Sequence, residues 1–268
     1  MSSRLEVFLI LVCVALTGGL FALSIKNTTE LANGEFRRLT EDGVQVLRTR
    51  LLTYMQRVNG TAAFIASSDD VRPYDFESYV STLQIKEQMP TINGIGWIVE
   101  VPTAELSDFA DQMRTAGQSE FELRKLTDED VHYIIKYIQP KETNSAALGL
   151  DVTFAPDRAE VLRKARDTGT HQMTPPIQLV QADKEVPGFV LLKPIFKNVQ
   201  AQKERGQFLG WINAAFVVEN LLVGLTAGQG DSYEIQVVDG PTAEDSLPVF
   251  DDRKDRTAAA VYSATYQL

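Results

Sequence analysis

The first pattern along the chain is an unbroken apolar run. Residues 7–25 are 19 positions without a charged side chain, bracketed by Glu6 and Lys26. As a helix this run would span roughly 28 Å, close to the hydrocarbon thickness of a membrane. A cleaved signal peptide is the alternative, with residues 22–24 as the cleavage site, but its apolar region is usually about 7–15 residues long. We therefore expect a retained transmembrane helix over residues 1–26.

After this run, apolar positions recur at helical spacing. Leu47, Leu51, Tyr54 and Val58 follow each other at steps of 4, 3 and 4, and Ile65 continues the register. This heptad-like seam predicts a stalk helix over residues 27–72. Two alternatives stay open for the seam. It pairs with a second copy to form a homodimer through the stalk, or it packs onto the domain that follows in the same chain.

Beyond residue 72, helical and strand-like segments follow each other irregularly. We expect helices over residues 75–89, 104–116, 156–167 and 217–225. We expect strands over residues 95–101, 121–126, 133–138, 174–180, 188–196, 208–216, 233–238 and 258–267, with a polar, charged loop between the last two. This order predicts an α+β fold with antiparallel strands, because regular alternation of the two element types is absent.

Composition narrows the classes of function. The formal net charge of −10 is opposite to the basic surface that a nucleic-acid-binding protein needs. Cys13 is the single cysteine, so an intrachain disulfide and a cysteine-based zinc site are both excluded. The sequence has no phosphate-binding loop, no H-E-x-x-H and no G-x-S-x-G motif. His132 and His171 are interpreted as ordinary histidines, and we expect no catalytic residues, no metal and no cofactor.

One segment is richer in candidate chemistry. Asp151 follows the apolar residues 147–150, where an ionised carboxylate would be costly to bury without hydrogen-bond donors. A ligand could supply such donors. The alternative is that Asp151 caps a local turn or the helix that begins at Pro156. The residues by themselves leave both interpretations open.

The ordered motifs along the chain resemble the CHASE domain, the extracytoplasmic sensor module of many bacterial membrane receptors and of plant cytokinin receptors. The resemblance rests on residues 90–97, 133–137, 144, 147–151, 165–169, 174–179, 188–189 and 194–196. It covers residues 75–215 directly, and the stalk and tail by their architecture. A long ordered set of this kind is unlike a chance agreement.

The resemblance implies two PAS-like antiparallel subdomains after the stalk. The membrane-distal one would cover residues 73–212 and bind a small ligand, and the membrane-proximal one would cover residues 213–268. Asp151 would hydrogen-bond the ligand, helped by the backbone at Met173 and Thr174. The pocket walls would be Trp97, Tyr137, Phe189 and Leu191. The resemblance also places the sensor outside the cell membrane, an orientation that the charges flanking the apolar run leave undecided.

The expected function is that of a small-molecule sensor domain of a transmembrane receptor. Members of the family usually continue through a second span to a cytoplasmic histidine kinase or nucleotide cyclase, and this chain stops at Leu268. We therefore expect a non-enzymatic fragment of a longer receptor. Two rivals are a surface-anchored hydrolase and a dimerisation or protein-interaction module without a small ligand. A sheet face filled by its own side chains would favour the interaction module.

Overall fold

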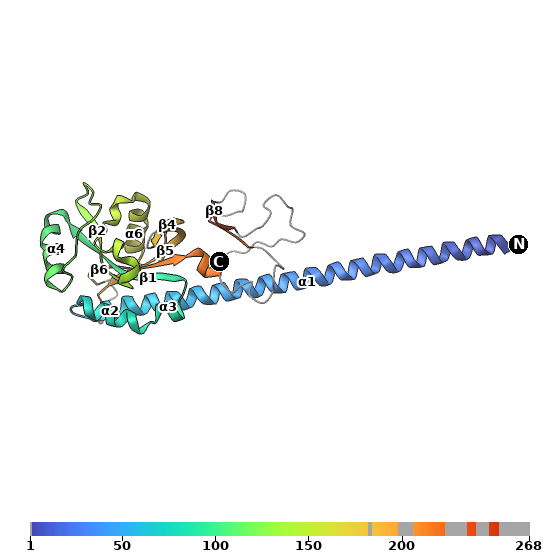
Figure 1. The fold of residues 1–268 in the computed structure, drawn as a ribbon, viewed down its shortest axis with the longest axis horizontal. Coiled ribbons are helices and arrows are strands. Elements are labelled where there is room, and N and C mark those ends of the chain that lie inside the picture. The colour runs from blue at the N-terminus through green and yellow to red at the C-terminus, as the bar shows by residue number, and fades with distance from the viewer. Residues whose placement is uncertain (1, 182–183, 198–205, 223–234, 240–246, 252–268) are drawn as a thin grey trace. The chain divides into compact units, whose positions relative to one another are not determined.

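The structure, a computed structural model, describes residues 2–181, 184–197, 206–222, 235–239 and 247–251. The chain divides into two compact units, Met1–Thr49 with Asp255–Leu268, and Arg50–Lys254. Helix α1, Ser2–Ser67, begins in the first unit and ends in the second (Figure 1). Each unit is described by itself below.

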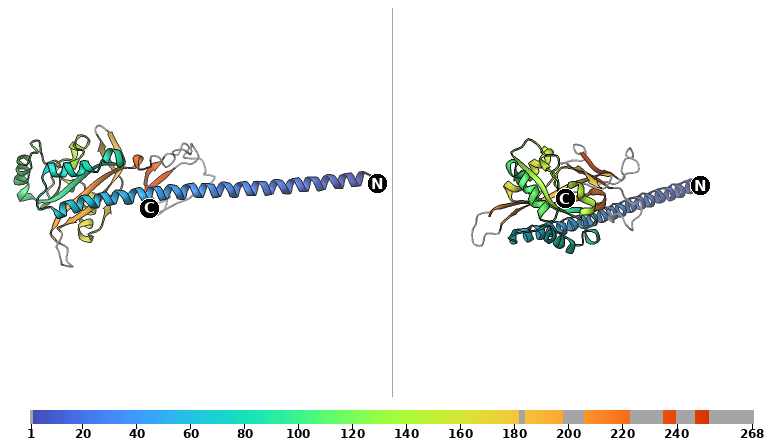
Figure 2. Two further views of the ribbon diagram at one scale, coloured as in Figure 1. Left: turned by 90° about the horizontal axis from the view of Figure 1, so that it is seen from below. Right: turned by 60° about the vertical axis from the view of Figure 1, so that its left-hand side comes forward.

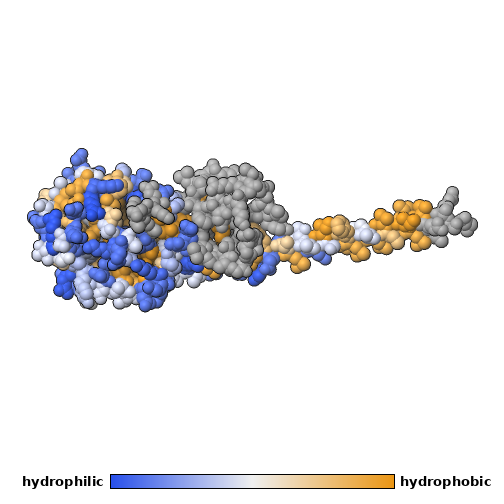
Figure 3. Space-filling view, viewed as in Figure 1, coloured by the Kyte–Doolittle hydropathy of each residue, from blue (hydrophilic) through white to orange (hydrophobic). Residues whose placement is uncertain are grey.

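The first unit carries the apolar stretch predicted as a membrane span. All side chains of residues 7–25 are exposed, and they form the hydrophobic surface of this part of the helix (Figure 3). The hydroxyl of Thr17 donates to the carbonyl oxygen of Cys13 at 2.8 Å, so this polar group is satisfied inside the helix. Among the described residues, α1 is the one helix long and apolar enough to cross a membrane.

The second unit is built on a six-stranded antiparallel sheet of order β2-β1-β6-β5-β3, with β4 paired to β5. The strands are β1 Ile92–Pro102, β2 Val131–Gln139, β3 Gln172–Met173, β4 Ile177–Gln181, β5 Lys184–Phe196 and β6 Phe208–Val217. The predicted α+β fold and its antiparallel sheet are confirmed. The expected boundary between subdomains at residues 212 and 213 falls inside β6, and the division into two subdomains stays a prediction.

One face of the sheet packs against the end of α1 and against α2, Pro73–Thr82 (Figures 1 and 2). The ring of Tyr54 in α1 lies 5.8 Å from that of Phe216 in β6, and Phe76 in α2 lies 5.5 Å from Tyr137 in β2. Val58 is fully buried. The seam residues Tyr54 and Val58 therefore pack inside their own chain, which is the intramolecular alternative for this part of the stalk.

The opposite face packs against α6, Pro156–Thr168. The indole nitrogen of Trp211 in β6 donates to the carbonyl oxygen of Leu162 at 2.8 Å, which ties the helix to the sheet. Pro156 occupies the first turn of α6, and Gly169 ends it with a φ of 70°, the left-handed conformation that favours glycine. The predicted helix is thus confirmed within about one residue at its end.

Shorter helices connect these elements. They are η1 Thr103–Glu105, α3 Ile85–Gln88, α4 Leu106–Thr115, α5 Lys141–Asn144, η2 Ser145–Ala147, η3 Val152–Phe154 and α7 Val218–Leu222. The single helix expected over residues 75–89 is wrong, because Gln84 adopts a φ of 50° and separates α2 from α3. Of the helix expected over residues 217–225, the part beyond residue 222 lies outside the described residues.

Two strand predictions near the edges need correction. Residues 121–126 form no strand: Arg124 makes one isolated bridge to Leu150, and Lys125 has a φ of 53° that an extended strand does not accommodate. The loop expected after residue 238 contains strand β8, Leu247–Asp251, which pairs with β7, Gln236–Asp239. The strand expected over residues 258–267 lies outside the described residues.

Two glycines of β1 are required by close approach. A Cβ at Gly96 would lie 2.5 Å from Oδ1 of Asn213 and 2.9 Å from the carbonyl oxygen of Tyr137. A Cβ at Gly94 would lie 2.8 Å from Nδ2 of Asn144. All three distances are far inside van der Waals contact, so β1 passes these neighbours with hydrogen atoms in place of side chains.

Candidate ligand site

The four predicted wall residues share the face that α1 and α2 cover. Trp97 is paired with Tyr137 on one side and with Ile212 on the other, and directly paired residues of antiparallel strands point to the same face. Leu191 and Phe189 lie on this face as well, because they pair with Ala214 and Phe216 of β6. The rings of Phe189 and Phe216 stack at 5.0 Å.

The polar groups of Trp97 and Tyr137 on this face are already bonded within the protein. The indole nitrogen of Trp97 donates to the carbonyl oxygen of Leu209 at 2.9 Å, and the hydroxyl of Tyr137 donates to that of Val71 at 3.0 Å. The ammonium group of Lys136 lies 4.4 Å from the centre of the Trp97 ring. Burial raises the pKa of Tyr137 and lowers that of Lys136. This face is thus filled by the side chains of its own chain.

The remaining predicted residues lie at opposite edges of the sheet. Asp151 forms a bridge to Ile134 on the outer edge of β2. Thr174 lies beside β5, where its hydroxyl accepts a hydrogen bond from the backbone nitrogen of Val190 at 2.9 Å. The side chain of Met173 is exposed, and its backbone pairs with Leu191. The structure therefore does not gather the seven predicted residues at one place, and their ligand contacts stay a prediction.

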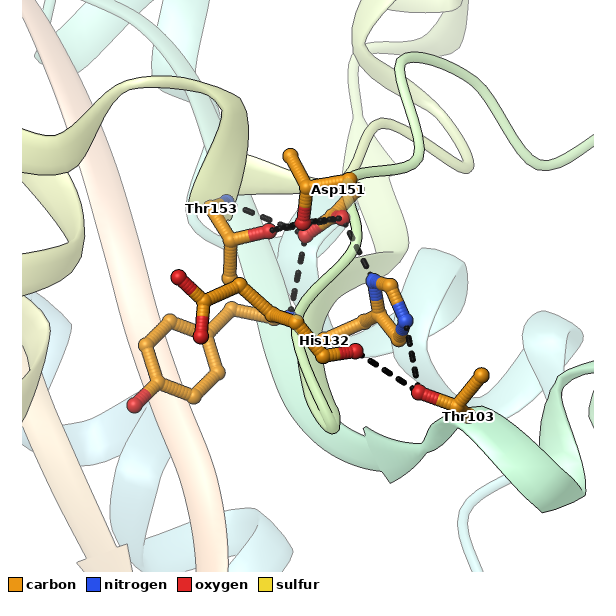
Figure 4. A network of polar contacts seen from close by, with 7 residues as sticks. Thr103, His132, Asp151 and Thr153 are labelled. Atoms are coloured by element: carbon orange, nitrogen blue, oxygen red, sulfur yellow. Dashed lines mark hydrogen bonds and ion pairs between the residues drawn. The ribbon is translucent and has the colours of Figure 1, made fainter.

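Asp151 is the centre of a buried polar network (Figure 4). One carboxylate oxygen accepts hydrogen bonds from the backbone nitrogens of Tyr133 and Thr153, at 3.2 and 3.0 Å. The other lies 2.7 Å from the hydroxyl of Thr153 and 2.7 Å from Nδ1 of His132. The backbone bond from Thr153 makes Asp151 the N-cap of η3. The local-cap alternative is therefore what the structure shows for this carboxylate.

His132 is hydrogen-bonded through both nitrogens of its ring. Thr103 donates its hydroxyl hydrogen to the carbonyl oxygen of Glu129 at 2.7 Å, so it accepts from Nε2 of His132 at 3.1 Å. Nδ1 faces the carboxylate on the other side of the ring. The ring of His132 is therefore held between two polar partners, the hydroxyl of Thr103 and the carboxylate of Asp151.

A hollow of about 210 Å³ adjoins this network, between the start of β2 and the first half of α6. Three of its residues are held by the network: Thr153 and Tyr133 through Asp151, and Glu129 through Thr103. Its other lining residues are Asp130, Val131, Pro156, Ala159 and Arg163. The network therefore sets the position of the walls of this hollow.

The hollow is lined by charged side chains and by the aromatic ring of Tyr133. Arg163 is hydrogen-bonded to the hydroxyl of Tyr133 and paired with Glu160 at 3.0 Å. Burial raises the pKa of Tyr133, and the hydrogen bond from Arg163 opposes that rise. In the part of the chain that the structure describes, no three His, Cys, Asp or Glu side chains are placed to hold a metal ion.

Comparison with protein families gives the decisive observation. The CHASE domain family matches residues 69–250, more than half of the chain. The chain belongs to the CHASE domain family. It is therefore classed with the extracytoplasmic sensor domains of signalling receptors, and its α1 supplies a candidate membrane span. No relative among curated proteins matches this CHASE domain protein.

Solved structures offer broad likenesses to this CHASE domain. The periplasmic sensory domain of the Campylobacter jejuni chemoreceptor Tlp1 is 13% identical with a TM-score of 0.47, covering 81% of this chain and 70% of that one. The ligand-binding domain of the Pseudomonas aeruginosa PAO1 amino acid chemoreceptor PctC, in complex with GABA, is 14% identical with a TM-score of 0.39, covering 74% and 71%. At such scores neither likeness carries an argument about this chain.

Sequence reasoning missed most of the residues around the hollow. His132, interpreted as an ordinary histidine, is the fully buried partner of Asp151. The strand expected over residues 133–138 begins one residue after His132, so the sequence did not mark His132 as a buried strand residue. Thr103, Glu129 and Arg163 carry no signal either, since they come from a loop or a helix whose exposed positions are ordinarily polar.

Proposed function

We propose that this CHASE domain binds a small molecule outside the membrane and passes its occupancy to a cytoplasmic histidine kinase or nucleotide cyclase of the same receptor. The observation that carries the proposal is the continuity of α1. One helix of 66 residues holds an exposed apolar stretch of membrane length and, from Arg50 onward, belongs to the unit that contains the sheet. The same helix thus contributes to both units, which makes it the element through which a change in the sensor can reach the membrane span.

Contacts of the last turns of α1 support this transmission. The hydroxyl of Tyr54 is hydrogen-bonded to that of Thr91 at 3.2 Å, next to the start of β1. The guanidinium of Arg50 donates to the carbonyl oxygen of Leu221 in α7 at 2.5 Å. Close-packed interiors pass on small shifts, and helix shifts of about 1–2 Å are a common form of switching. β1 pairs with β2, so a change at the hollow has a contiguous route to α1.

We also propose that the receptor is a homodimer, but that residues other than the predicted seam hold the two copies together. Tyr54 and Val58 are buried in their own chain, so they are not free to pair. Leu52 lies on the exposed side of α1. We expect cysteine at position 52 to crosslink two copies under mild oxidation and cysteine at position 58 to remain unlinked. A twofold pair is also the simplest state in which two cytoplasmic outputs meet.

The interaction module without a small ligand stays as the second candidate. The specific observation in its favour is the filled face of the sheet, where Trp97, Tyr137 and Phe189 pack against their own chain. The hollow beside β2 favours the sensor, because it combines charged groups, an aromatic ring and apolar walls at a position set by a buried network. Small-molecule binding separates the two candidates.

The test is native mass spectrometry of the full chain extracted from membranes into detergent. We expect a bound small molecule that is released on denaturation and whose return raises the unfolding temperature. A chain that carries no small molecule, and whose unfolding temperature is unchanged by concentrated cell-envelope extract, would instead support the interaction module.

A further inference from the structure

Strand β6 carries a buried amide whose oxygen is left without a partner. Asn213 is 6% exposed, and within the described residues its Oδ1 has no hydrogen-bond partner. A buried acceptor with its hydrogen bond unmade destabilises a fold, because it has lost its hydration and gained nothing in return. We propose that a neutral small molecule with an N–H or O–H donor completes this hydrogen bond, between the sheet and α6.

This inference rests on the small-molecule sensing proposed above and names the chemical class of the ligand. Asn213 is not among the seven predicted site residues, and it does not line the hollow beside β2. It therefore adds a ligand contact at a further place in the sensor.

The direction of the amide follows from the geometry of β6. Trp211 lies two residues before Asn213 on this strand, so the two side chains point to the same face of the sheet. The indole nitrogen of Trp211 donates to the carbonyl oxygen of Leu162, so this is the face on which α6 packs. A Cβ at Gly96 would lie 2.5 Å from Oδ1 of Asn213, which places the amide against the bare backbone of β1. The unpartnered oxygen therefore lies on the α6 side of the sheet.

The row of residues that crosses the sheet at this level is uncharged. Its members, each paired with the next on the neighbouring strand, are Ile138, Gly96, Asn213, Leu192 and Gln172. Directly paired residues share a face, so the whole row lies on the α6 side. A charged ligand would be costly to bury here, because the row offers no counter-ion. The row therefore favours a neutral ligand.

The same row favours an organic molecule over a lone water. A buried water needs about two to four polar partners. Apart from Asn213, the polar side chain in the row is that of Gln172, whose amide nitrogen donates to the hydroxyl of Thr170 at 2.9 Å. The side chains of Ile138 and Leu192 are apolar and buried. A molecule with one donor for Asn213 and an apolar body matches this surface.

Strand β6 also connects the amide to the membrane helix. It lies between β1 and β5 and runs directly into α7. The carbonyl oxygen of Leu221 in α7 accepts from the guanidinium of Arg50 in α1. A ligand that bonds to Asn213 therefore acts on a strand that continues into a contact with α1. This gives the ligand a route to the signal.

The experiment is a calorimetric titration of the full chain in detergent micelles with butyramide, N,N-dimethylbutyramide and butyrate. The three molecules share a propyl body. Butyramide is neutral and has N–H donors, its dimethyl derivative is neutral without a donor, and butyrate is charged. We expect butyramide to bind about tenfold more tightly than either of the others.

Two variants of Asn213 test the acceptor itself. Asn213→Leu keeps the approximate volume of the side chain, and Asn213→Ala shortens it; each should weaken butyramide binding about tenfold. Without ligand, the unfolding temperature of Asn213→Leu should equal or exceed that of the unmodified chain, because an unpaired acceptor has left the core. A residue that only supports the fold would not show this opposite movement of binding and stability. Asn33→Leu, at an exposed amide of α1, is the matched control and should change neither quantity.

The possible outcomes are distinct. Absent butyramide binding, equal binding of butyramide and its dimethyl derivative, or an affinity that both variants leave unchanged overturns the inference. A sharp fall in the unfolding temperature of both variants also overturns it, since the amide would then have a partner inside the protein. A molecule that copurifies with the chain and is retained in full by both variants overturns it while the sensing function stands. Absence of any bound small molecule, added or copurified, removes the sensing function as well.

Discussion

The covered face of the sheet and the outer edge of β2 are built on opposite principles. On the face, the ring of Trp97 packs against that of Tyr137 and the ring of Phe189 against that of Phe216, and Leu191 is buried. The indole of Trp97 and the hydroxyl of Tyr137 each donate to one backbone carbonyl. At the edge, Asp151 and His132 are fully buried and lie in a network of several polar partners. The face is stabilised by apolar area, and the edge by satisfied hydrogen bonds.

This difference separates two kinds of surroundings for the predicted site residues. On the covered face the aromatic side chains contact each other, as the rings of Phe189 and Phe216 do at 5.0 Å. The edge keeps a hollow open beside its network, because hydrogen bonds hold the walls without filling the space between them. Buried polar networks are most costly when partly satisfied, so the edge is also the part that a single substitution disturbs most.

The largest effect is expected from Asp151→Ala. It removes the acceptor of His132 and leaves that ring without its partner in a buried site, at a cost of about 3–5 kcal/mol. A chain of this size should then melt roughly 6–20 °C lower. Asp108→Ala on the exposed side of α4 is the control for loss of a carboxylate. A melting temperature within about 2 °C of the unmodified chain would show that the network is not structural.

The covered face is tested by Leu191→Ala. Leu191 is buried beside β6, and its truncation leaves a cavity, with an expected loss of about 3 kcal/mol within the usual range of about 2–5. Urea unfolding gives the free energy. An unchanged free energy of unfolding would show that Leu191 does not stabilise the covered face.

Tyr137→Phe gives a smaller effect with a distinct pH dependence. Loss of the hydrogen bond to Val71 should cost about 1 kcal/mol at neutral pH. Burial, reinforced by Asp70 and Asp75, raises the pKa of Tyr137 above the ordinary value of 10.0. Above about pH 10 the unfolded chain loses the proton that the folded chain keeps, so stability falls as pH rises. Urea titrations at pH 8 and pH 10.5 should show a smaller fall in the variant; an identical fall would contradict this.

The smallest effect is expected from Lys136→Met. The ammonium group over the Trp97 ring contributes on the order of 0.5–1 kcal/mol, and the burial that lowers its pKa offsets part of this. Methionine keeps the aliphatic stem, so the free energy of unfolding should change by less than about 1 kcal/mol. A loss as large as that of Asp151→Ala would mean that charge, and not apolar packing, stabilises the covered face.

Much of the fold could be predicted, and the reasons are local. α6 is bounded by Pro156 and Gly169, residues with fixed roles at helix ends, and β1 by turn residues and Pro102. The helix break at Gln84 and the absence of a strand at Lys125 could not be predicted, because each is a non-glycine residue with a positive φ. Propensity gives no warning of a conformation that tertiary contacts impose.

The candidate site could be predicted in part. The sequence did not show on which face of the sheet Trp97 lies. β1 is buried on both faces of the sheet, so its sequence has no alternation of apolar and polar residues. The importance of Asp151 followed from a charge in an apolar run. Its partners did not follow, because His132 and Thr103 are brought to it by the pairing of β1 with β2 and not by any spacing along the sequence.

Gly94 and Gly96 of β1 differ in how a larger residue could replace them during evolution. At Gly94 the nearest atoms to an added methyl group belong to the side chain of Asn144, so alanine becomes admissible once Asn144 has been replaced by something smaller. At Gly96 the backbone carbonyl of Tyr137 would remain at 2.9 Å whatever residue replaced Asn213. Substitution of Gly94 therefore depends on the residue at position 144. Substitution of Gly96 is blocked by the backbone itself.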